Sequence, residues 1–371
     1  MILGARTAAW AKAGGPTPPA YGGLCFTAEA ANSSVQLTAV GSAPVVTLIK
    51  SFDGVNWEDY AVSEVIDLPR AGDFVYLAAG EGGNNAFGAS VGEYHKFVIN
   101  GLVASSGDIT SILNFDCAQT TLASYCYCNM FRGCTGLTSA PELPATTLVD
   151  SCYNSMFRGC TGLTSAPELP ATTLATNCYR SMFQGCTGLT SAPELPATTL
   201  ATNCYSYMFD GCTGLTSAPE LPATTLANSC YNSMFRGCTG LTSAPELPAT
   251  TLAPNCYSSM FNGCTGLTSA PELPTTTLAT GCYQHMFRGC TGLTSAPELP
   301  ATTLATNCYI SMFYGCKNIS IIKIHFTLWN KSSNGWVNEV ASTGTFYKPT
   351  ALPEEYGTSK IPTGWTVVNI D

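Results

Sequence analysis

Residues 152–177, CYNSMFRGCTGLTSAPELPATTLATN, decide the fold, because they recur almost unchanged as residues 178–203, CYRSMFQGCTGLTSAPELPATTLATN. Copies of this 26-residue unit follow one another from about residue 116 to residue 316. Self-similarity at a fixed period of about 20–50 residues is typical of solenoids, in which each unit buries its apolar side against its neighbours. The sequence therefore predicts a stacked-repeat protein.

The first half of each unit has apolar residues at a spacing typical of a helix. Leu148, Cys152 and Met156 are four residues apart, and Gly159 suits a helix C-terminus. We therefore expect a short helix over residues 147–158, with a threonine at its N-cap.

The second half of the unit, residues 163–170 (LTSAPELP), is expected to be an extended arm. Alternation predicts that Leu163, Ser165, Pro167 and Leu169 point inward. Because proline cannot donate to a ladder, the parallel sheet should be short or interrupted. Strands stack about 4.8 Å apart whereas helices need about 10 Å, so the column should curve into an arc or horseshoe, with strands on the concave side and helices on the convex side.

The flanking segments differ from the repeats. Short β-rich runs separated by turn residues predict a small all-β sandwich over residues 24–115, with strands at residues 35–39, 45–50, 62–68, 74–78 and 94–99. Residues 1–23 are interpreted as an N-terminal arm and linker. Residues 317–371 are interpreted as a C-terminal cap, because the tryptophans and the strand-forming run 319–326 interrupt the repeat where a solenoid needs its open end covered.

Charge and composition narrow the function classes. The net charge is −9, only 11% of residues are charged, and lysines and arginines are not clustered, so we expect neither nucleic acid nor another polyanion as the partner. The N-terminus lacks the apolar run of a signal peptide, and no stretch is long enough for a membrane span.

Sixteen of the 19 cysteines recur in register, which indicates buried repeat positions with free thiols rather than disulfides or metal ligands. They form eight pairs: Cys126/Cys134, Cys152/Cys160, Cys178/Cys186, Cys204/Cys212, Cys230/Cys238, Cys256/Cys264, Cys282/Cys290 and Cys308/Cys316.

No catalytic constellation is visible. His95, His285 and His325 are scattered over three regions, and none lies beside a repeated acid or nucleophile. We therefore expect no catalytic residues, no metal site and no cofactor.

Two repeated features are candidate working surfaces. The first is an acidic column expected on the concave face, in which like charges would repel unless solvent screens them or a cation or basic partner neutralises them. Its members are Glu142, Glu168, Glu194, Glu220, Glu246, Glu272 and Glu298.

The second is a variable stripe on the convex face, where otherwise near-identical units differ from one another. Drift at exposed positions and a diversified recognition surface both explain it. As a ligand-binding hypothesis the stripe comprises Asn154, Arg158, Arg180, Gln184, Ser206, Asp210, Asn232, Arg236, Ser258, Asn262, Gln284 and Arg288.

The unit CYxxMFxGCTGLTSAPELP resembles the BspA-like, Treponema-type leucine-rich repeats common in gut bacteria and their phages. The resemblance implies an α/β leucine-rich-repeat solenoid of short parallel strands and short convex helices. The flanking segments ARTAAW (5–10), SFDGVNW (51–57) and LPEEYGTSKIPTGW (352–365) look like proteins carried by phages and prophages of gut anaerobes.

The function that these resemblances imply is non-catalytic. We expect a phage virion-associated fibre, spike or decoration protein, docked to other virion proteins through its N-terminal arm or β-domain. Its solenoid would adhere to a host-surface protein or glycan, or to a mucosal ligand. A virion protein is assembled in the host cytoplasm and needs no signal peptide. The alternative is a bacterial cell-surface adhesin. In either case the protein could be a homo-oligomer. The third class, a glycoside hydrolase, would need a carboxylate pair in a cleft.

Overall fold

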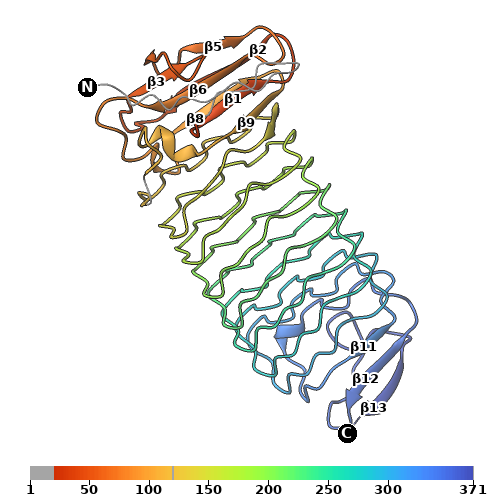
Figure 1. Cartoon of the computed structure of the whole chain (residues 1–371). Coiled ribbons are helices and arrows are strands. Elements are labelled where there is room, and N and C mark those ends of the chain that lie inside the picture. Colours follow the sequence, from red (N-terminus) through yellow and green to blue (C-terminus); the bar gives the residue numbers. More distant parts are fainter. Residues whose placement is uncertain (1–20, 119–120, 371) are drawn as a thin grey trace.

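A computed structural model describes residues 21–118 and 121–370. The predicted N-terminal arm lies almost entirely outside these residues. The described chain forms a β-domain, a long column of stacked coils and a small sheet at the far end (Figure 1). Each 26-residue unit makes one coil of the column.

The β-domain contains two sheets. A six-stranded sheet has the order β10-β9-β1-β6-β3-β4, formed by Leu137–Ser139, Val103–Ser106, Cys25–Ala28, Phe74–Ala79, Leu48–Ser51 and Glu58–Tyr60. A four-stranded sheet has the order β5-β2-β8-β7, formed by Val65–Leu68, Ser33–Val40, Glu93–Asn100 and Gly88–Ser90. The sheets share one core, in which the rings of Phe26 and Phe97 lie 4.9 Å apart between centroids. Each of the five predicted runs overlaps a strand, although β1, β4, β7 and β9 were not foreseen.

The β-domain is joined to the column by backbone hydrogen bonds. β10 belongs to the first coil and pairs in parallel with β9. In the other sheet, the N–H of Phe97 donates to the carbonyl of Met130 at 2.7 Å, and that of Phe87 donates to Cys126 at 2.9 Å. A short 3-10 turn, η1 (Ile109–Ile112), lies at the same junction. The β-domain therefore covers the first coil, whose N–H and carbonyl groups would otherwise be open to solvent.

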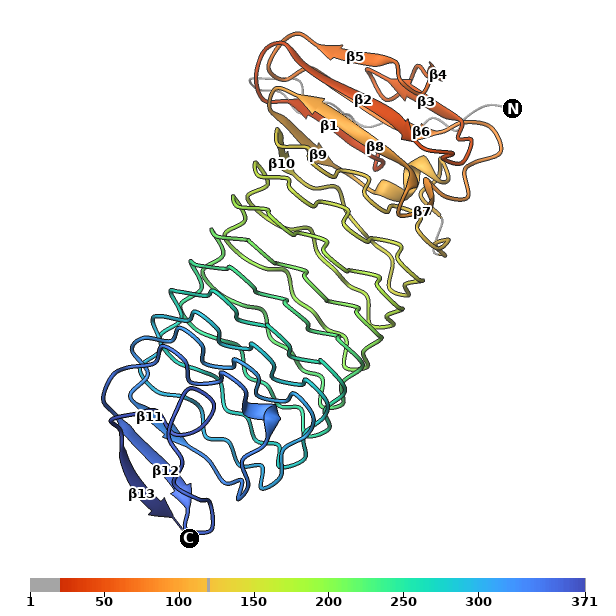
Figure 2. The ribbon, with the colours of Figure 1, turned by 180° about the vertical axis from the view of Figure 1, so that it is seen from behind.

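The predicted helix over residues 147–158 is wrong. The segment is a series of tight turns in which every fourth residue has a positive φ: Ser151 at 57°, Ser155 at 55° and Gly159 at 76°. An α-helix of L-residues does not tolerate such angles. The equivalent segments of the other described coils have the same pattern, and Figures 1 and 2 show them as zigzag traces without helical ribbons.

Hydrogen bonding between coils explains why turns replace the helix. The N–H groups of Tyr153 and Phe157 donate to Cys178 and Met182 of the next coil at 3.0 and 2.9 Å. Ser155 between them also donates to the next coil, whereas the alternate residues Asn154 and Met156 donate within the segment, each at 3.2 Å. Half of the N–H groups therefore form a ladder along the column, which a helix that satisfies its own N–H groups cannot do.

Two continuous columns of aromatic rings run through the core. Neighbouring tyrosines from Tyr127 to Tyr309 stack with centroids 5.7–6.2 Å apart, and neighbouring phenylalanines from Phe131 to Phe313 stack 5.3–5.9 Å apart. Packed helices need about 8–10 Å between their axes, so rings at this spacing could not come from a helix in every coil. The ring spacing therefore requires the turn conformation.

The cysteines are buried in the same core, as their registry predicts. The thiol of Cys160 donates to the carbonyl of Phe131 at 3.0 Å, and the equivalent bond recurs along the column. All sixteen repeat cysteines are free and at most 2% exposed. Burial raises the pKa of the Cys178 thiol to about 12, so these thiols are protonated and unreactive at neutral pH.

The extended arms of the described repeats pair only at isolated points, such as Ser243 with Ser269 and Ser295 with Ile321, so the predicted interruption of the sheet is confirmed. Leu163 and Leu169 are buried as expected, but Ser165 is exposed and Pro167 half-buried. Strict alternation is therefore wrong in this arm, because its two prolines prevent a regular strand.

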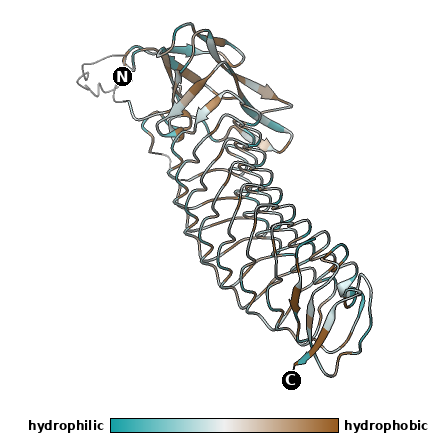
Figure 3. Cartoon of the chain, turned by 90° about the vertical axis from the view of Figure 1, so that its right-hand side faces the viewer, coloured by the Kyte–Doolittle hydropathy of each residue, from teal (hydrophilic) through white to brown (hydrophobic). Residues whose placement is uncertain are grey.

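The expected convex layer of helices, and with it the strongly curved horseshoe, is also wrong, and of the predicted arc only a gentle bend is found (Figure 3). The premise of the horseshoe was a layer of wide helices opposite a layer of narrow strands, and the described coils contain no such helices. The column is long and bends only gently, as the side view in Figure 3 shows. Both faces of the column have the spacing of hydrogen-bonded backbone, which removes the cause of strong curvature.

The C-terminal segment continues the column as irregular coils. Its parallel sheet β11-β12-β13 consists of Ile321–Lys323, Thr345–Pro349 and Thr366–Ile370, and η2 is Lys331–Ser333. The N–H of Phe313 donates to the carbonyl of Trp336 at 2.8 Å, which extends the turn ladder by one coil. Trp336 is fully buried and covers the ends of both ring columns, 6.4 Å from Tyr309 and 6.1 Å from Phe313.

Candidate functional site

The outward side chains of the turn segments form one continuous surface, which we call the turn face. It comprises residues 150–159 and their equivalents in the other coils. All twelve residues of the predicted variable stripe lie in these segments. Eight are exposed or half-buried, whereas four are buried at 1–8% exposure: Asn154, Ser206, Asp210 and Ser258. The accessible part of the stripe is therefore smaller than the sequence suggests.

A polar network centres on the buried Asp210. Arg236, in the next coil, donates from Nε to Oδ1 at 2.9 Å and from Nη2 to Oδ2 at 2.7 Å. Gln184, in the preceding coil, donates to Oδ2 at 2.7 Å. Such a bidentate pair is planar and directional, so Asp210 fixes the orientation of the Arg236 guanidinium. The carboxylate in turn raises the pKa of Arg236.

Tyr207 lies between two arginines. The Arg180 guanidinium carbon is 5.6 Å from the ring centroid and that of Arg236 is 5.5 Å from it, both within the range of cation–π attraction. The equivalent position is serine in several coils, including Ser181 and Ser233. Tyr207 has a φ of 58°, a conformation that costs a bulky side chain about 1–3 kcal/mol.

The variable stripe did not include Tyr207. The signal was present in the sequence, because an aromatic residue replaces serine in an otherwise constant frame. The stripe was defined only by the positions equivalent to residues 154 and 158.

A second departure from the repeat lies three coils further along, at His285. This residue also replaces serine and has a φ of 57°. Gln284 donates to its Nε2 at 3.2 Å, while its Nδ1 is buried without a partner. Burial lowers the pKa of His285, and Arg288 lowers it further. Arg288 lies 4.8 Å from the ring centroid of Tyr314.

The acidic column lies on the opposite side of the core, along the extended arms. All seven of its glutamates are exposed. Glu298 forms ion pairs with Lys323 at 2.9 Å and His325 at 2.6 Å, which lower the pKa of its carboxyl group. Within the described chain the other six have no ion-pair partner, and their charges are left to solvent.

A comparison with family models identifies the repeats. The model of the BspA type leucine rich repeat region matches residues 120–268 and 202–334, more than half of the chain. The chain belongs to the BspA-type leucine-rich repeat family. Searches found neither a curated protein nor a solved structure that matches it. BspA-type repeats are typical of surface and adhesion proteins, and leucine-rich repeats are generally not catalytic.

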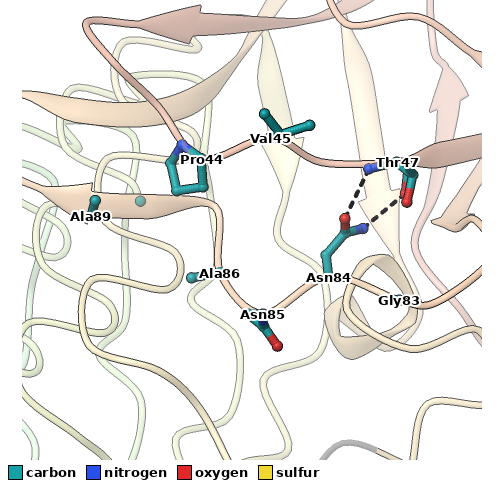
Figure 4. Close-up of a pocket in the computed structure, with 9 residues that line it drawn as sticks. Pro44, Val45, Thr47, Gly83, Asn84, Asn85, Ala86 and Ala89 are labelled. Carbon is teal, nitrogen blue, oxygen red and sulfur yellow. Dashed lines mark hydrogen bonds between the residues drawn. The ribbon is translucent and has the colours of Figure 1, made fainter.

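Two depressions in the described part of this BspA-type protein do not resemble an active site. One, in the β-domain, is lined by Pro44, Val45 and backbone around Asn84, which exchanges two 2.9 Å hydrogen bonds with Thr47 (Figure 4). It contains no ionisable side chain. The other, near Trp329, has a single carboxylate. A glycosidase would need two carboxyl groups across a cleft.

Two further findings concern the described residues only. They contain no group of three or more His, Cys, Asp or Glu side chains placed to hold a metal ion. They also contain no helix long and apolar enough to cross a bilayer. Of the three histidines, His95 is buried with Nδ1 against the Phe87 carbonyl, and the other two belong to the surfaces described above.

Proposed function

We propose that this protein is a non-catalytic adhesion protein of phage virions, a fibre, spike or decoration protein whose turn face binds a protein or glycan of the host surface. Membership of the BspA-type family supports adhesion. The resemblance of the flanking segments to phage-borne proteins supports a location in the virion.

The observation that carries the proposal is where the coils differ. Inward positions are nearly constant, and their Cys, Tyr, Met and Phe side chains are at most 2% exposed. Differences concentrate on the turn face, where Tyr207 keeps a strained backbone beside Arg180 and Arg236. Strain of this kind persists where the surroundings hold it, often at binding sites. Aromatic and arginine side chains are also the residues that most often dominate binding interfaces.

The β-domain is the proposed attachment end. It lies at one end of the column and is hydrogen-bonded to the first coil, so a particle bound to it would leave the turn face of the remaining coils accessible. Its partners would be other virion proteins.

A bacterial cell-surface adhesin is the second candidate, favoured by the family match alone. The two candidates share the turn-face mechanism and differ in location. Immunogold labelling of purified phage particles and of intact bacteria separates them. Labelled particles support the virion protein, whereas labelled bacteria with unlabelled particles overturn it in favour of the cell-surface adhesin.

Adhesion itself is tested with the full chain on host cells. Replacing Tyr207 and Arg180 together by serine should reduce cell binding, because these side chains form the centre of the turn face. The matched control replaces Glu168 and Glu194 by glutamine on the opposite face and should leave binding unchanged. Equal binding by both variants would overturn the turn face as the adhesive surface.

A further inference from the structure

The charges of the repeats are separated between two faces. Between residues 121 and 316 the chain has five arginines, all in turn segments, and seven of its nine acidic residues form the acidic column. The remaining two, Asp150 and Asp210, lie on the turn face. The arginines are Arg132, Arg158, Arg180, Arg236 and Arg288, of which all but the half-buried Arg158 are exposed.

This separation changes the argument from net charge. The chain carries −9 in total, which argues against an anionic partner. At physiological ionic strength, however, charges are screened beyond about 8 Å. A ligand on the turn face would therefore meet mainly the local arginines, because the glutamates lie across the core. The turn face is locally cationic on an acidic protein.

Three of these arginines are widely spaced, because Arg180, Arg236 and Arg288 stand in every second coil, whereas Arg132 and Arg158 stand in the two successive coils before Arg180. The guanidinium carbons of Arg180 and Arg236 are 5.6 and 5.5 Å from the same Tyr207 centroid, so they are at most 11.1 Å apart. Arg236 and Arg288 occupy equivalent positions two coils apart, and the intervening phenylalanine rings are spaced 5.8 and 5.7 Å. The cationic groups thus recur at about two coil spacings along this part of the face.

Two of these arginines are held in place before any ligand arrives. Asp210 accepts hydrogen bonds from Nε and Nη2 of Arg236. The other edge of the Arg236 guanidinium is left available to a ligand, and the Arg236 side chain is 45% exposed. The Tyr207 ring orders Arg180, for which the described residues offer no acidic partner. A guanidinium fixed in advance loses less conformational entropy on binding a carboxylate or sulfate.

We propose that the turn face binds an acidic polysaccharide whose carboxylate or sulfate groups are separated by about two sugar residues. The inference rests on the proposed adhesive function and names its ligand class. Double-stranded nucleic acid carries a charge about every 1.7 Å, so most of its phosphates would have no cationic partner on this face. A polysaccharide with sparse charges matches the spacing, and its sugar hydroxyls can bond the amides of Gln184, Asn232 and Asn262.

The test measures binding of the full chain to immobilised hyaluronan, which has one carboxylate on every second sugar, by biolayer interferometry. Neutral dextran and double-stranded DNA are the comparison surfaces. We expect binding to hyaluronan but not to dextran, and weaker binding to DNA. Affinity should fall between about 0.1 M and 1 M salt, where the Debye length falls from about 10 to about 3 Å.

The variants are chosen to keep the fold. Arg180→Gln and Arg288→Gln break no ion pair, and each should weaken hyaluronan binding by up to about fivefold. Arg236 is kept, because removing it would leave Asp210 buried without its partner. The control is the pair Glu168→Gln and Glu194→Gln on the acidic column, with the unfolding midpoint of every variant checked.

Each outcome bears on the inference separately from the adhesive function. Loss of hyaluronan binding in the arginine variants, with the glutamine control unaffected, supports it. No binding to hyaluronan, binding indifferent to the arginines, or equally tight binding to DNA overturns it. If host-cell adhesion still depends on Tyr207 while hyaluronan is not bound, the adhesive function stands and the ligand is instead a protein or a neutral glycan.

Discussion

A glycine substitution at Ser259 distinguishes the turn conformation from a helix by the sign of its effect. Ser259 has a φ of 56° and is half-buried, and no side-chain hydrogen bond would be lost on its replacement. A left-handed conformation costs an L-residue about 1–2 kcal/mol, which glycine avoids. Glycine loses about 0.5–1 kcal/mol more backbone entropy than alanine on folding. Ser259→Gly should therefore be about 0.5–1 kcal/mol more stable than Ser259→Ala.

A helix predicts the reverse order. In a helix interior, alanine is about 1 kcal/mol more stable than glycine. The chain itself supports the turn, because Gly281 stands with a φ of 60° at a left-handed position that is tyrosine in the first coil and serine or asparagine in the others. Combining the change with the equivalent one at Ser181, three coils away, should roughly double the difference, since distant sites add.

The assay is guanidinium denaturation followed by circular dichroism, with the midpoint as the readout and an unchanged slope as the control for a common unfolded state. Alanine variants that are more stable than the glycine variants would refute the turn assignment. Equal stability would refute the strain argument, because it would mean that the left-handed conformation costs nothing here.

Three further outcomes follow from the core and from the end of the acidic column. Phe209→Ala, in the middle of the phenylalanine column, should cost about 3–5 kcal/mol of unfolding free energy in the same assay, and a loss below about 1 kcal/mol would contradict the packed stack. A thiol reagent at pH 8 should modify the half-buried Cys117 first and the buried repeat cysteines only after unfolding, and rapid modification of several thiols in the native protein would contradict this. Glu298 has a lowered pKa in the folded state, so its ion pairs stabilise the protein above the carboxyl's normal pKa of about 4.3 and are lost as pH falls through the folded value. The protection factors of the β11 amides, corrected for the intrinsic exchange rate at each pH, should therefore fall more in acid in the native chain than in Glu298→Gln. Identical pH profiles of protection in the two proteins would exclude the pairs.

The period of the repeat and the burial of its residues could be predicted, but the local backbone could not. Cys152 and Met156 are four residues apart, and a helix and a chain of four-residue turns both bring them inward. The distinguishing signal was the spacing of large rings. Tyr153 and Phe157 recur in every coil, and such rings can stack in continuous columns only if neighbouring coils are about 6 Å apart. A helical coil is too wide for that spacing. Periodicity within one unit is compatible with both a helix and a chain of turns, and the stacking of rings between units distinguishes the two.

The candidate site was foreseen in part for a related reason. Variation between units located the turn face, but it did not distinguish buried from exposed side chains. It included both Asn154, which is buried, and Arg180, which is exposed. Exposure depends on which residues of each turn point outward, and that depends on the backbone. Tyr207 was missed because the expected helix gave its position no special conformation, whereas the turn makes it a strained site.

The partner class shows most clearly what placement adds to composition. A net charge of −9 describes the whole chain, but a ligand meets only the side chains within a screening length of it. Because the turn and the extended arm of every coil lie on opposite sides of one core, any charge fixed at one repeat position becomes a line of charge on one face. The glutamate of the PELP segment is constant, so its line is unbroken and acidic. The arginines of the turns vary, so their line is sparse and cationic, and sparse cations on a rigid spacing select ligands by the distance between anionic groups rather than by total charge.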